Sequence, residues 1–471
     1  MKKDEILSME ELFCEIVDKG EESLFYTRSR EGIFSPALVM WLEISNRVEG
    51  RKSLLGALTS LGEGNGSQVV GRNIVGSKPL KEKRVSISSG GLCRARQRLG
   101  VDEVERVCRL ISTALLKEGG ETNLWNSKRV YLMDGTIISL QQSKRTFSKY
   151  APVANQNGTC KTGQLICTCI HDLFTGIALS PAFGAYTGAN AIGETRLGKM
   201  MIQRLWEPGV IIGDRAFGIF STAWTAKEHG HEVLLRLTAT RAESIRGKYF
   251  GAVEIDEEVV WEAGNLNLHP EIPTDAKVRG RVIHKIVKRK GFKPLSLVFF
   301  TTLKESVEEL ALLYQQRERI ENDIRSLKYT LEMEMLNAKS PEVLEKELLL
   351  GFAANNLVRA VLARAARKLK IPARKISFMS GLTLTKAYGN KLRDAKDPKQ
   401  RRLITDRFLT GLYQTKLPNR TKQRMEPRKV TRLAKQFPFM KKSRDEERAD
   451  ALKVAQEHGH RGFFTTVTRK Y

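Results

Sequence analysis

The stretch RVYLMDGTIISL, residues 129–140, decides the fold of this chain. Its run of apolar and β-branched residues predicts a buried strand, and Asp134 closes the apolar run. Two similar stretches follow, TGQLICTCIHD at 162–172 and TGIALSPAFG at 175–184. They predict a hairpin that turns at residues 172–176. The core of the chain therefore begins with three consecutive strands.

The next elements alternate between helix and strand. We expect a helix over about 190–205, a buried strand over GVIIGD (209–214), a helix after Phe217 and a strand over HEVLLRLT (231–238). Three strands followed by helix, strand, helix and strand are typical of an α/β sheet with mixed strand directions. The predicted fold class is therefore α/β, a mixed sheet with flanking helices.

A β-rich insertion is predicted at about residues 238–293, where two strand-like stretches flank the turn-rich NLNLHPEIPTD. LSLVFFTTL (295–303) then returns to a buried strand. The pattern beyond it predicts one long helix over about 304–336 and a second over about 340–368. The insertion thus separates the last core strand from the helices that follow.

Three regions result from these patterns. Residues 1–125 are predicted to be helical, and residues 1–25 among them to form an acidic, exposed helix. Residues 126–338 contain the sheet and its insertion. Residues 339–471 are predicted to be helical and basic.

The net charge points to a polyanionic partner. The 471 residues include 80 Lys and Arg against 53 Asp and Glu, a formal charge of +27 that is costly through self-repulsion. Nucleic acid is the leading candidate, because each phosphate that a cation neutralises releases counterions. A general solubility charge, or binding to ribosomes or a membrane surface, is the alternative on charge alone.

We expect an intracellular protein without membrane association. No uninterrupted apolar run reaches the roughly 18–20 residues that span a bilayer, and the start has no apolar h-region. The six cysteines are too few and too scattered for a disulfide framework. Reduced thiols are therefore expected.

One predicted helix of the N-terminal region is basic. Ser88 or Ser89 can cap a helix that displays Arg94, Arg96 and Arg98. Short helices of which one is basic suit helix-turn-helix-like DNA binding. An ordinary amphipathic helix with a solvated basic face is an equal alternative.

Three carboxylates stand out by position. Asp134 and Asp214 each close an apolar strand, where ligand sites of α/β sheets gather, although Asp134 before a glycine also suits a turn. Glu321 is the third and lies in the predicted long helix. Three separated carboxylates suit a two-metal site, because Mg²⁺ prefers hard oxygen ligands and two ions can serve both oxygens of a phosphodiester displacement.

The helix around Glu321 presents several polar groups on one face. Tyr314, Arg317, Glu321 and Lys328 fall within about 60° of one another at 100° per residue. Arginine and lysine there could hold DNA phosphates, the first as a planar fork and the second as a point charge. A solvated charged face is the alternative.

These residues resemble the bacterial DDE transposases of insertion-sequence family four. The family signature Y-x2-R-x3-E-x6-K is matched without gaps by Tyr314, Arg317, Glu321 and Lys328. Asp134 in D-G-T and Asp214 in G-D-R-x-F-G are similar to the first and second aspartates of the family. The resemblance is strong over about 128–338, weaker over the N-terminal helices and weakest after about 370.

The resemblance implies a ribonuclease-H-like core with a β-rich insertion. It implies Mg²⁺-dependent nicking of transposon ends and joining of the 3′-hydroxyl to target DNA, with Mn²⁺ able to substitute. Asp134, Asp214 and Glu321 would be the catalytic metal ligands. Other residues would contact DNA: Tyr314, Arg317, Lys328, more weakly Arg215, and in the N-terminal helices Arg94, Arg96 and Arg98. The partners implied are double-stranded DNA and a second copy of the chain, paired through the C-terminal region, at the bacterial nucleoid in the cytoplasm.

One feature departs from the family. Well-known members stack a flipped base on a tryptophan shortly before the signature helix, which needs a flat aromatic face. Residues 285–313 contain Phe292, Phe299 and Phe300 but no tryptophan, and Trp261 lies further upstream. Either another aromatic residue substitutes or the hairpin step differs, and we expect Trp261 to be a core residue.

Two other functions fit the same residues. One is a metal-dependent nuclease of this fold that does not join DNA ends. The other is a non-catalytic DNA-binding protein derived from a transposase, although the presence of all six motif residues argues against decay.

Overall fold

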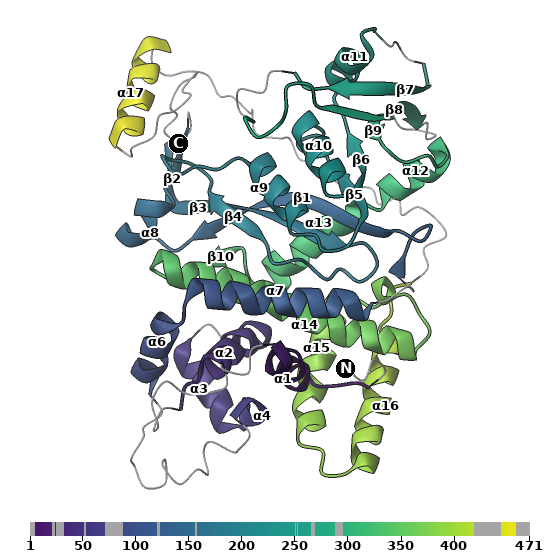
Figure 1. Ribbon diagram of the computed structural model, residues 1–471. Helices are drawn as coiled ribbons and strands as arrows, with labels where there is room; N and C mark the ends of the chain where they lie inside the picture. The colour runs from purple at the N-terminus through teal and green to yellow at the C-terminus, as the bar shows by residue number, and fades with distance from the viewer. Residues whose placement is uncertain are drawn as a thin grey trace, which may run out of the picture.

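The computed structural model shows a sheet in the upper part of the molecule and a layer of helices beneath it (Figure 1). The parts of the chain that the structure describes are residues 5–20, 24, 33–50, 53–70, 88–119, 123–155, 158–249, 251, 253–264, 269–287, 295–418 and 444–457.

The core of the sheet has mixed strand directions. Strand β1 pairs antiparallel with β3 and parallel with β5, β4 pairs antiparallel with β3, and β6 pairs parallel with β5. The bounds are β1 Arg129–Leu140, β3 Gly158–Asp172, β4 Ala182–Ala185, β5 Gly209–Gly213 and β6 Glu232–Arg236. An antiparallel meander followed by two parallel strands is the ribonuclease-H-like mixed α/β arrangement, so the predicted fold class is confirmed.

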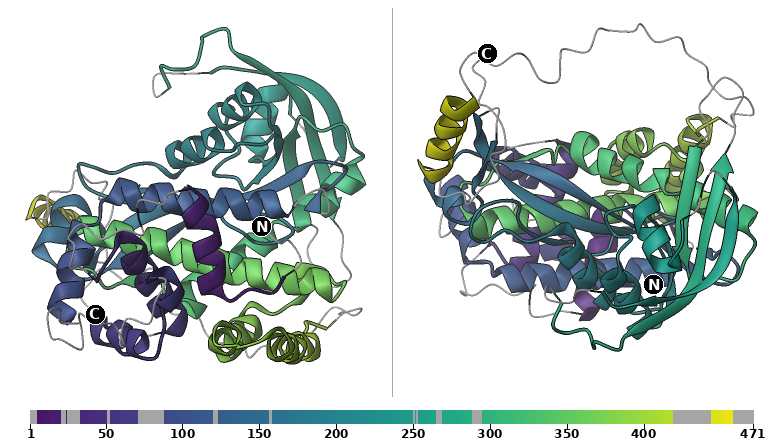
Figure 2. Two further views of the ribbon diagram at one scale, coloured as in Figure 1. Left: turned by 60° about the horizontal axis from the view of Figure 1, so that its bottom comes forward. Right: turned by 90° about the horizontal axis from the view of Figure 1, so that it is seen from above.

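The strands of the predicted insertion extend this sheet. The sheet order is β2-β3-β1-β5-β6-β9-β8-β7, so β8 and β7 continue the core sheet beyond β9 instead of forming a sheet of their own. The strands of the insertion are β7 Ile255–Glu262 and β8 Lys277–Val287, the strand that follows it is β9 Leu295–Thr301, and β2 at the other edge covers Pro152–Asn155. Strands β7 and β8 stand at one end of the molecule, opposite α17 (Arg444–Glu457) (Figure 2).

Side chains on β1 alternate between two packed faces. Val130 and Leu132 belong to a cluster that includes residues of α12 and α13, whereas Tyr131 and Met133 face the larger cluster. Helix α9 (Glu194–Gln203) lies on that second side, because Gly198 packs close to the sulfur of Met133. This period of two fixes on which face of the sheet each polar residue of β1 emerges.

The predicted long helix over 304–336 is wrong, because the chain breaks it into three pieces. They are α12 Val307–Gln315, α13 Glu318–Arg325 and a π-helical segment over Ser326–Thr330, followed by β10 Met335–Leu336. Tight turn bonds separate the first two, since the Arg317 N–H bonds the Tyr314 carbonyl at 2.9 Å. No proline or glycine marks this break, and the π turn then changes the rotation per residue.

Two long helices run side by side beneath the sheet, α7 (Val101–Glu118) and α14 (Pro341–Lys368) (Figure 1). By length and composition α14 could cross a membrane, which the expectation from uninterrupted apolar runs did not foresee. The whole of its most apolar window is buried inside the fold, where it packs against α7 and α2. The apolar residues of α14 are therefore part of the protein core.

The first helix is not exposed as predicted. Helix α1 covers Met9–Gly20, and Leu12, Phe13, Ile16 and Val17 are buried. Its apolar stripe packs against α7 and α14, which the acidic composition of residues 1–25 concealed. The N-terminal region also contains α2 Pro36–Glu49, α3 Leu54–Gly62, α4 Ser67–Val70 and α6 Ser89–Arg98.

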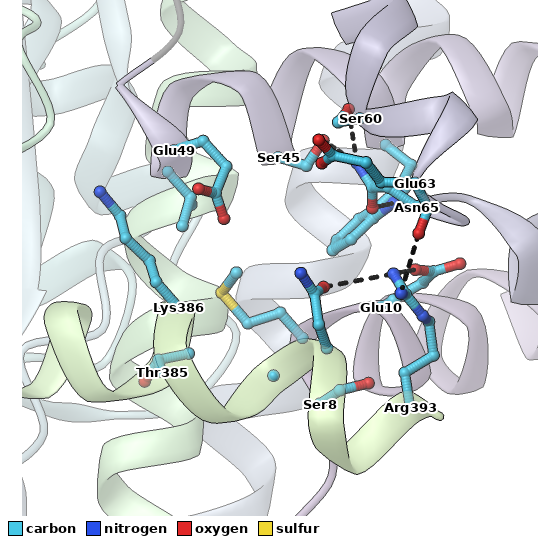
Figure 3. A pocket seen from close by; sticks show the side chains of 15 residues that line it. Ser8, Glu10, Ser45, Glu49, Ser60, Glu63, Asn65, Thr385, Lys386 and Arg393 are labelled. Carbon is cyan, nitrogen blue, oxygen red and sulfur yellow. Dashed lines mark hydrogen bonds and ion pairs between the residues drawn. The ribbon is translucent and has the colours of Figure 1, made fainter. Parts of the chain in front are cut away.

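A small polar pocket joins the N-terminal helices to α15 (Phe378–Arg393) (Figure 3). Asn65 accepts a bond from the Trp41 indole at 2.8 Å and donates to Ser45 at 2.8 Å. Arg393 lies 3.8 Å from Glu10, whose pKa is raised by burial. The N-terminal helices and α15 therefore pack against each other although they are distant in sequence. The proposed domain boundaries at residues 125 and 338 stay a prediction.

Five further helical segments complete the described part of the fold. They are α8 Lys144–Lys149, α10 Phe220–Glu228, α11 Ala239–Arg246, a 3₁₀ turn at Ala373–Lys375 and α16 Pro398–Gln414. Most of the basic stretch predicted after residue 416 lies outside the described residues.

Candidate active site

The register of two parallel strands brings Asp134 and Asp214 together. The last paired residues of β1 and β5 are Leu132 and Ile212, so both aspartates follow two residues beyond that pair. A step of two keeps each carboxylate on the face of Leu132 and Ile212, and neighbouring strands lie about 4.8 Å apart. The two carboxylates are therefore neighbours on the sheet face that α12 and α13 cover.

Asp134 does not end its strand, contrary to the prediction. It lies within β1 and pairs with Cys169 of β3, and only the parallel pairing with β5 stops before it. The carboxylate is left on the sheet face because β5 has ended there. Its Oδ1 accepts the N–H of Gly135 at 2.9 Å. Burial raises the pKa of Asp134, Arg317 opposes this rise and Asp214 adds to it.

Asp214 does follow the end of its strand. Its Oδ1 accepts the N–H of Ala216 at 2.9 Å, and its carbonyl accepts the N–H of Gly218 at 3.1 Å. The turn after β5 therefore holds the carboxylate in place through the backbone. A side chain of this kind, fixed by N–H donors at a strand end, suits ligand binding.

Arg317 links Asp134 to Glu321. Its Nη1 lies 3.1 Å from Asp134 Oδ2, and its Nη2 lies 2.5 Å from Glu321 Oε1. Glu321 is about half exposed, with a side-chain exposure of 52% against 19% for Asp134. The structure thus brings the three predicted carboxylates to one place, with a guanidinium between the first and the third.

A fourth carboxylate, Glu194, was missed by the sequence reasoning. It starts α9 and packs against Gly135, where an added Cβ would come 1.6 Å from Glu194 Oε1. Burial raises its pKa to about 6, and repulsion from Asp214 and Asp134 adds to the rise. The only sequence signal was an acidic residue in the first turn of a predicted helix, which is common.

Replacing Glu194 with glutamine is expected to lower metal-dependent DNA cleavage roughly 10–100-fold, the usual cost of losing a group that supports metal ligands. Gly135→Ala should have a similar effect, because the new methyl group displaces the same carboxylate. Rates of end cleavage at saturating DNA measure both. Glu228→Gln, at an exposed glutamate, and Gly264→Ala, where a Cβ meets nothing within 4 Å, are matched controls. Cleavage unchanged in both test variants would remove Glu194 from the site.

The other predicted site residues differ in how deeply they are buried. Tyr314 is buried against Phe299, with ring centroids 4.7 Å apart, and burial raises its pKa while Arg317 and Arg236 lower it. Lys328 is half-buried in the π-helical segment, and no ion pair joins it to the carboxylates among the described residues. Arg215 is exposed beside Asp214. The shared face predicted for one straight helix is therefore only partly present.

The predicted basic helix exists and is capped by Ser88, which accepts the N–H of Gly91 at 3.0 Å. Arg94 and Arg98 are exposed on it, whereas Arg96 pairs with Glu43 at 3.0 Å. Arg96 thus stabilises the contact between α6 and α2. Two of the three arginines remain open to a partner, and their DNA contact stays a prediction.

The aromatic residues considered for base stacking are mostly in the core. Trp261 is buried between Phe300, 4.8 Å away by ring centroids, and Phe220, 5.9 Å away. Phe299 and Phe300 are buried, and Phe292 lies outside the described residues. The expectation that Trp261 is a core residue agrees with this packing.

The donor set suits a divalent cation. Carboxylate oxygens are the ligands that Mg²⁺ prefers, and a cation would offset both the burial and the mutual repulsion that raise the pKa values of Asp134 and Glu194. Among the described residues, however, no three His, Cys, Asp or Glu side chains already converge as a metal-binding group. Arg317 occupies the space between two of them, so Glu321 must exchange partners to bind a metal.

Comparison with known proteins identifies the class. A family model described as the Transposase DDE domain matches residues 125–357, which include both aspartates and Glu321. This match and the relative described next support a DDE transposase, and the chain is a DNA transposase. It is similar to the transposase InsG for insertion sequence element IS4 of Escherichia coli strain K12, with 22% identity over 372 residues, 76% of this chain and 80% of InsG. The resemblance to insertion-sequence family four is therefore confirmed.

A solved structure is also similar. The cryo-EM structure of the piggyBac transposase synaptic complex with hairpin DNA matches with a TM-score of 0.41 and 11% identity, covering 88% of this chain and 84% of that one.

Proposed function

We propose that this transposase nicks transposon ends and joins them to target DNA with Asp134, Asp214 and Glu321 as its catalytic residues. The observation that carries the proposal is the register of β1 and β5, which places two aspartates side by side under the helix that bears Glu321. Both reactions displace an oxygen at phosphorus, so one site can perform them in turn.

The chain's own residues have distinct tasks in this scheme. Asp134 and Asp214 are held by backbone N–H groups at fixed positions on the sheet. Arg317 pairs with Asp134 and Glu321 and can exchange one carboxylate for a phosphate oxygen, because its fork bonds either group. Lys328 and Arg215 would add positive charge along the DNA backbone. Tyr314, whose carbonyl accepts the Arg317 N–H, would help to position Arg317.

Mg²⁺, or Mn²⁺ in its place, would be held by Asp134, Asp214 and Glu321 and would activate the attacking oxygen and stabilise the leaving one. Glu194 would keep the negative charge around the pair of aspartates high and so favour cation binding.

The partners follow from the reaction. Double-stranded DNA serves as transposon end and as target, and two ends must be paired, which two copies of the chain would do through the C-terminal region. The net charge of +27 supports a nucleic-acid partner. We place this work at the nucleoid of the bacterial cytoplasm.

The test uses the full chain, a labelled duplex that carries the element's own terminal sequence, and a circular target plasmid. With Mg²⁺ we expect nicking at the end and covalent joining of label to plasmid, and neither product after chelation with EDTA. Glu321→Gln should remove both products while DNA binding remains, because the amide keeps the shape of the side chain but not its charge.

Three other outcomes would contradict the proposal. Nicking without joining would indicate a nuclease of the same fold. Binding without either product would indicate a non-catalytic DNA-binding protein. Full activity of Glu321→Gln would remove this residue from the site. Exposed Glu334 supplies the matched control Glu334→Gln, which should behave as wild type.

A further inference from the structure

A large basic pocket lies behind the helix that carries Glu321. It is enclosed by α13, the second half of α14, the 3₁₀ turn at Ala373–Lys375 and the start of α15, which are neighbours in the fold (Figure 1). Asp323 lines this rear pocket, and it is two residues, or about 200° of helix, away from Glu321. Asp323 therefore faces the rear pocket on the side of α13 away from Glu321, whereas Arg325, one turn after Glu321, lines the edge of the pocket nearer the carboxylate site.

Among the described residues that line the rear pocket, cations outnumber acids. Among the described lining residues the acid is Asp323, and the cations are Arg319, Arg325, Arg359, Arg367, Arg374 and Lys375. Asp323 pairs with Arg359 at 2.7 Å and, through both carboxylate oxygens, with Arg374. Glu118, which lies outside the lining, pairs with Arg367 but is shared with Arg364.

Burial, more than the neighbouring cations, disfavours the charged form of the arginines in the rear pocket, and Asp323 only partly offsets it. Arg359 is buried, its Nε has no hydrogen-bond partner among the described residues, and burial lowers its pKa to about 10 while Arg374 adds to the fall. Burial and Arg374 also lower the pKa of Arg319. Buried cations of one sign are costly unless an anion compensates them, so the rear pocket favours an anionic ligand.

Other lining groups suit phosphate oxygens. The N-terminus of α15, a helix of 16 residues, borders the rear pocket through Ser377 and Phe378, and its dipole favours negative charge. The Phe378 ring lies 4.5 Å from the Arg359 guanidinium and fixes its plane.

The size of the rear pocket argues for a polymer. Its volume of about 1130 Å³ exceeds the roughly 300–1,000 Å³ typical of small-molecule sites. Cations spaced along three elements match a series of phosphates better than a single one.

We propose that the rear pocket binds the phosphate backbone of DNA, as a second contact that is separate from the carboxylate site. The inference rests on the proposed DNA transposition and adds where a part of the DNA runs: behind α13, along the start of α15. Binding there would restrain the position of the helix that carries Arg317 and Glu321. DNA held on both faces of α13 would thus fix the position of the signature residues.

Salt-dependent DNA binding tests this proposal. Arg319→Gln combined with Arg325→Gln removes two cations that donate to the Leu173 carbonyl and to the Asn322 amide oxygen, so these hydrogen bonds involve no carboxylate. The probe is a fluorescently labelled random-sequence DNA duplex in EDTA, which separates binding from any cleavage. We expect roughly tenfold weaker binding for each arginine, and a slope of log affinity against log salt that is shallower by about 2.

The matched control is Arg402→Gln with Arg407→Gln, two exposed arginines of α16, which should leave affinity and slope as in wild type. Arg319→Lys with Arg325→Lys keeps the charge and should keep the slope. Melting temperatures check that each variant is folded. Equal losses in the α16 control, or no loss in the pocket variant, would overturn the proposal.

A small-anion site is distinguished by calorimetry with inorganic phosphate. Millimolar binding of phosphate that disappears in the pocket variant, without any change in DNA affinity, would assign the rear pocket to a free anion and overturn the DNA reading. Since every readout is binding, failure of end cleavage in the wild type would contradict the proposed function and leave this inference standing.

Discussion

Replacing Asp214 with asparagine is expected to lower DNA cleavage and joining by about 10³-fold or more. The amide keeps the acceptor that bonds the Ala216 N–H, so the turn after β5 stays in place, but it removes the negative charge beside Asp134. Loss of a charged metal ligand costs several kcal/mol of transition-state stabilisation, and each 1.36 kcal/mol is a factor of ten. Single-turnover cleavage of a labelled transposon end measures the effect.

Two controls make this result specific. Asp406→Asn changes an exposed aspartate of α16 and should cleave at the wild-type rate. DNA binding by Asp214→Asn should be equal to or tighter than wild type, because a charge that repels phosphate is gone. An Asp214→Asn protein that binds and cleaves as wild type would show that the site lies elsewhere.

Replacing Arg364 with methionine is expected to destabilise the protein by about 3–5 kcal/mol, at the lower end because Glu118 keeps Arg367. Arg364 of α14 bonds Glu118 of α7 through Nε and Nη2, both at 2.8 Å, and the two side chains are only 1% and 4% exposed. Methionine fills the space but leaves a buried carboxylate that has lost its main partner. Denaturant unfolding followed by far-UV circular dichroism measures the change.

A double variant separates charge from packing in this pair. Arg364→Met with Glu118→Leu replaces both ions by apolar groups, which is often neutral, and should recover most of the lost stability. Exposed Arg402→Met is the matched single control and should change stability little. If the double variant were as unstable as Arg364→Met alone, the loss would come from shape and not from the unpaired carboxylate.

The core of the sheet was predictable from local patterns. Apolar runs at 129–140 and 209–214 predicted β1 and β5, and both aspartates were singled out because each follows such a run. Strand prediction succeeded because a buried strand needs a short apolar run whatever lies around it. The same logic could not reveal that β7 and β8 continue the core sheet, because the sequence of a single strand does not show with which strand it pairs.

The helix around Glu321 shows where such patterns fail. QQR at 315–317 contains no helix breaker, yet α12 ends there and Arg317 turns toward Asp134. An ion pair with a residue 183 positions away cannot be read from local spacing. For the same reason Glu194 was missed, because only its approach to Gly135 distinguishes it from other acidic residues at helix starts.

The sequence by itself determined the class of fold, a net charge for which nucleic acid is the leading partner, and the residues that match a transposase signature, because apolar periodicity, composition and motif spacing are local properties. The tertiary structure alone decided that Asp134 and Asp214 share a level of the sheet, that Arg317 bridges two carboxylates and that Glu194 lies near enough to repel both aspartates. It also placed the cations of the rear pocket around one buried aspartate. These are contacts between elements, fixed by strand register and helix packing, on which the chemistry depends.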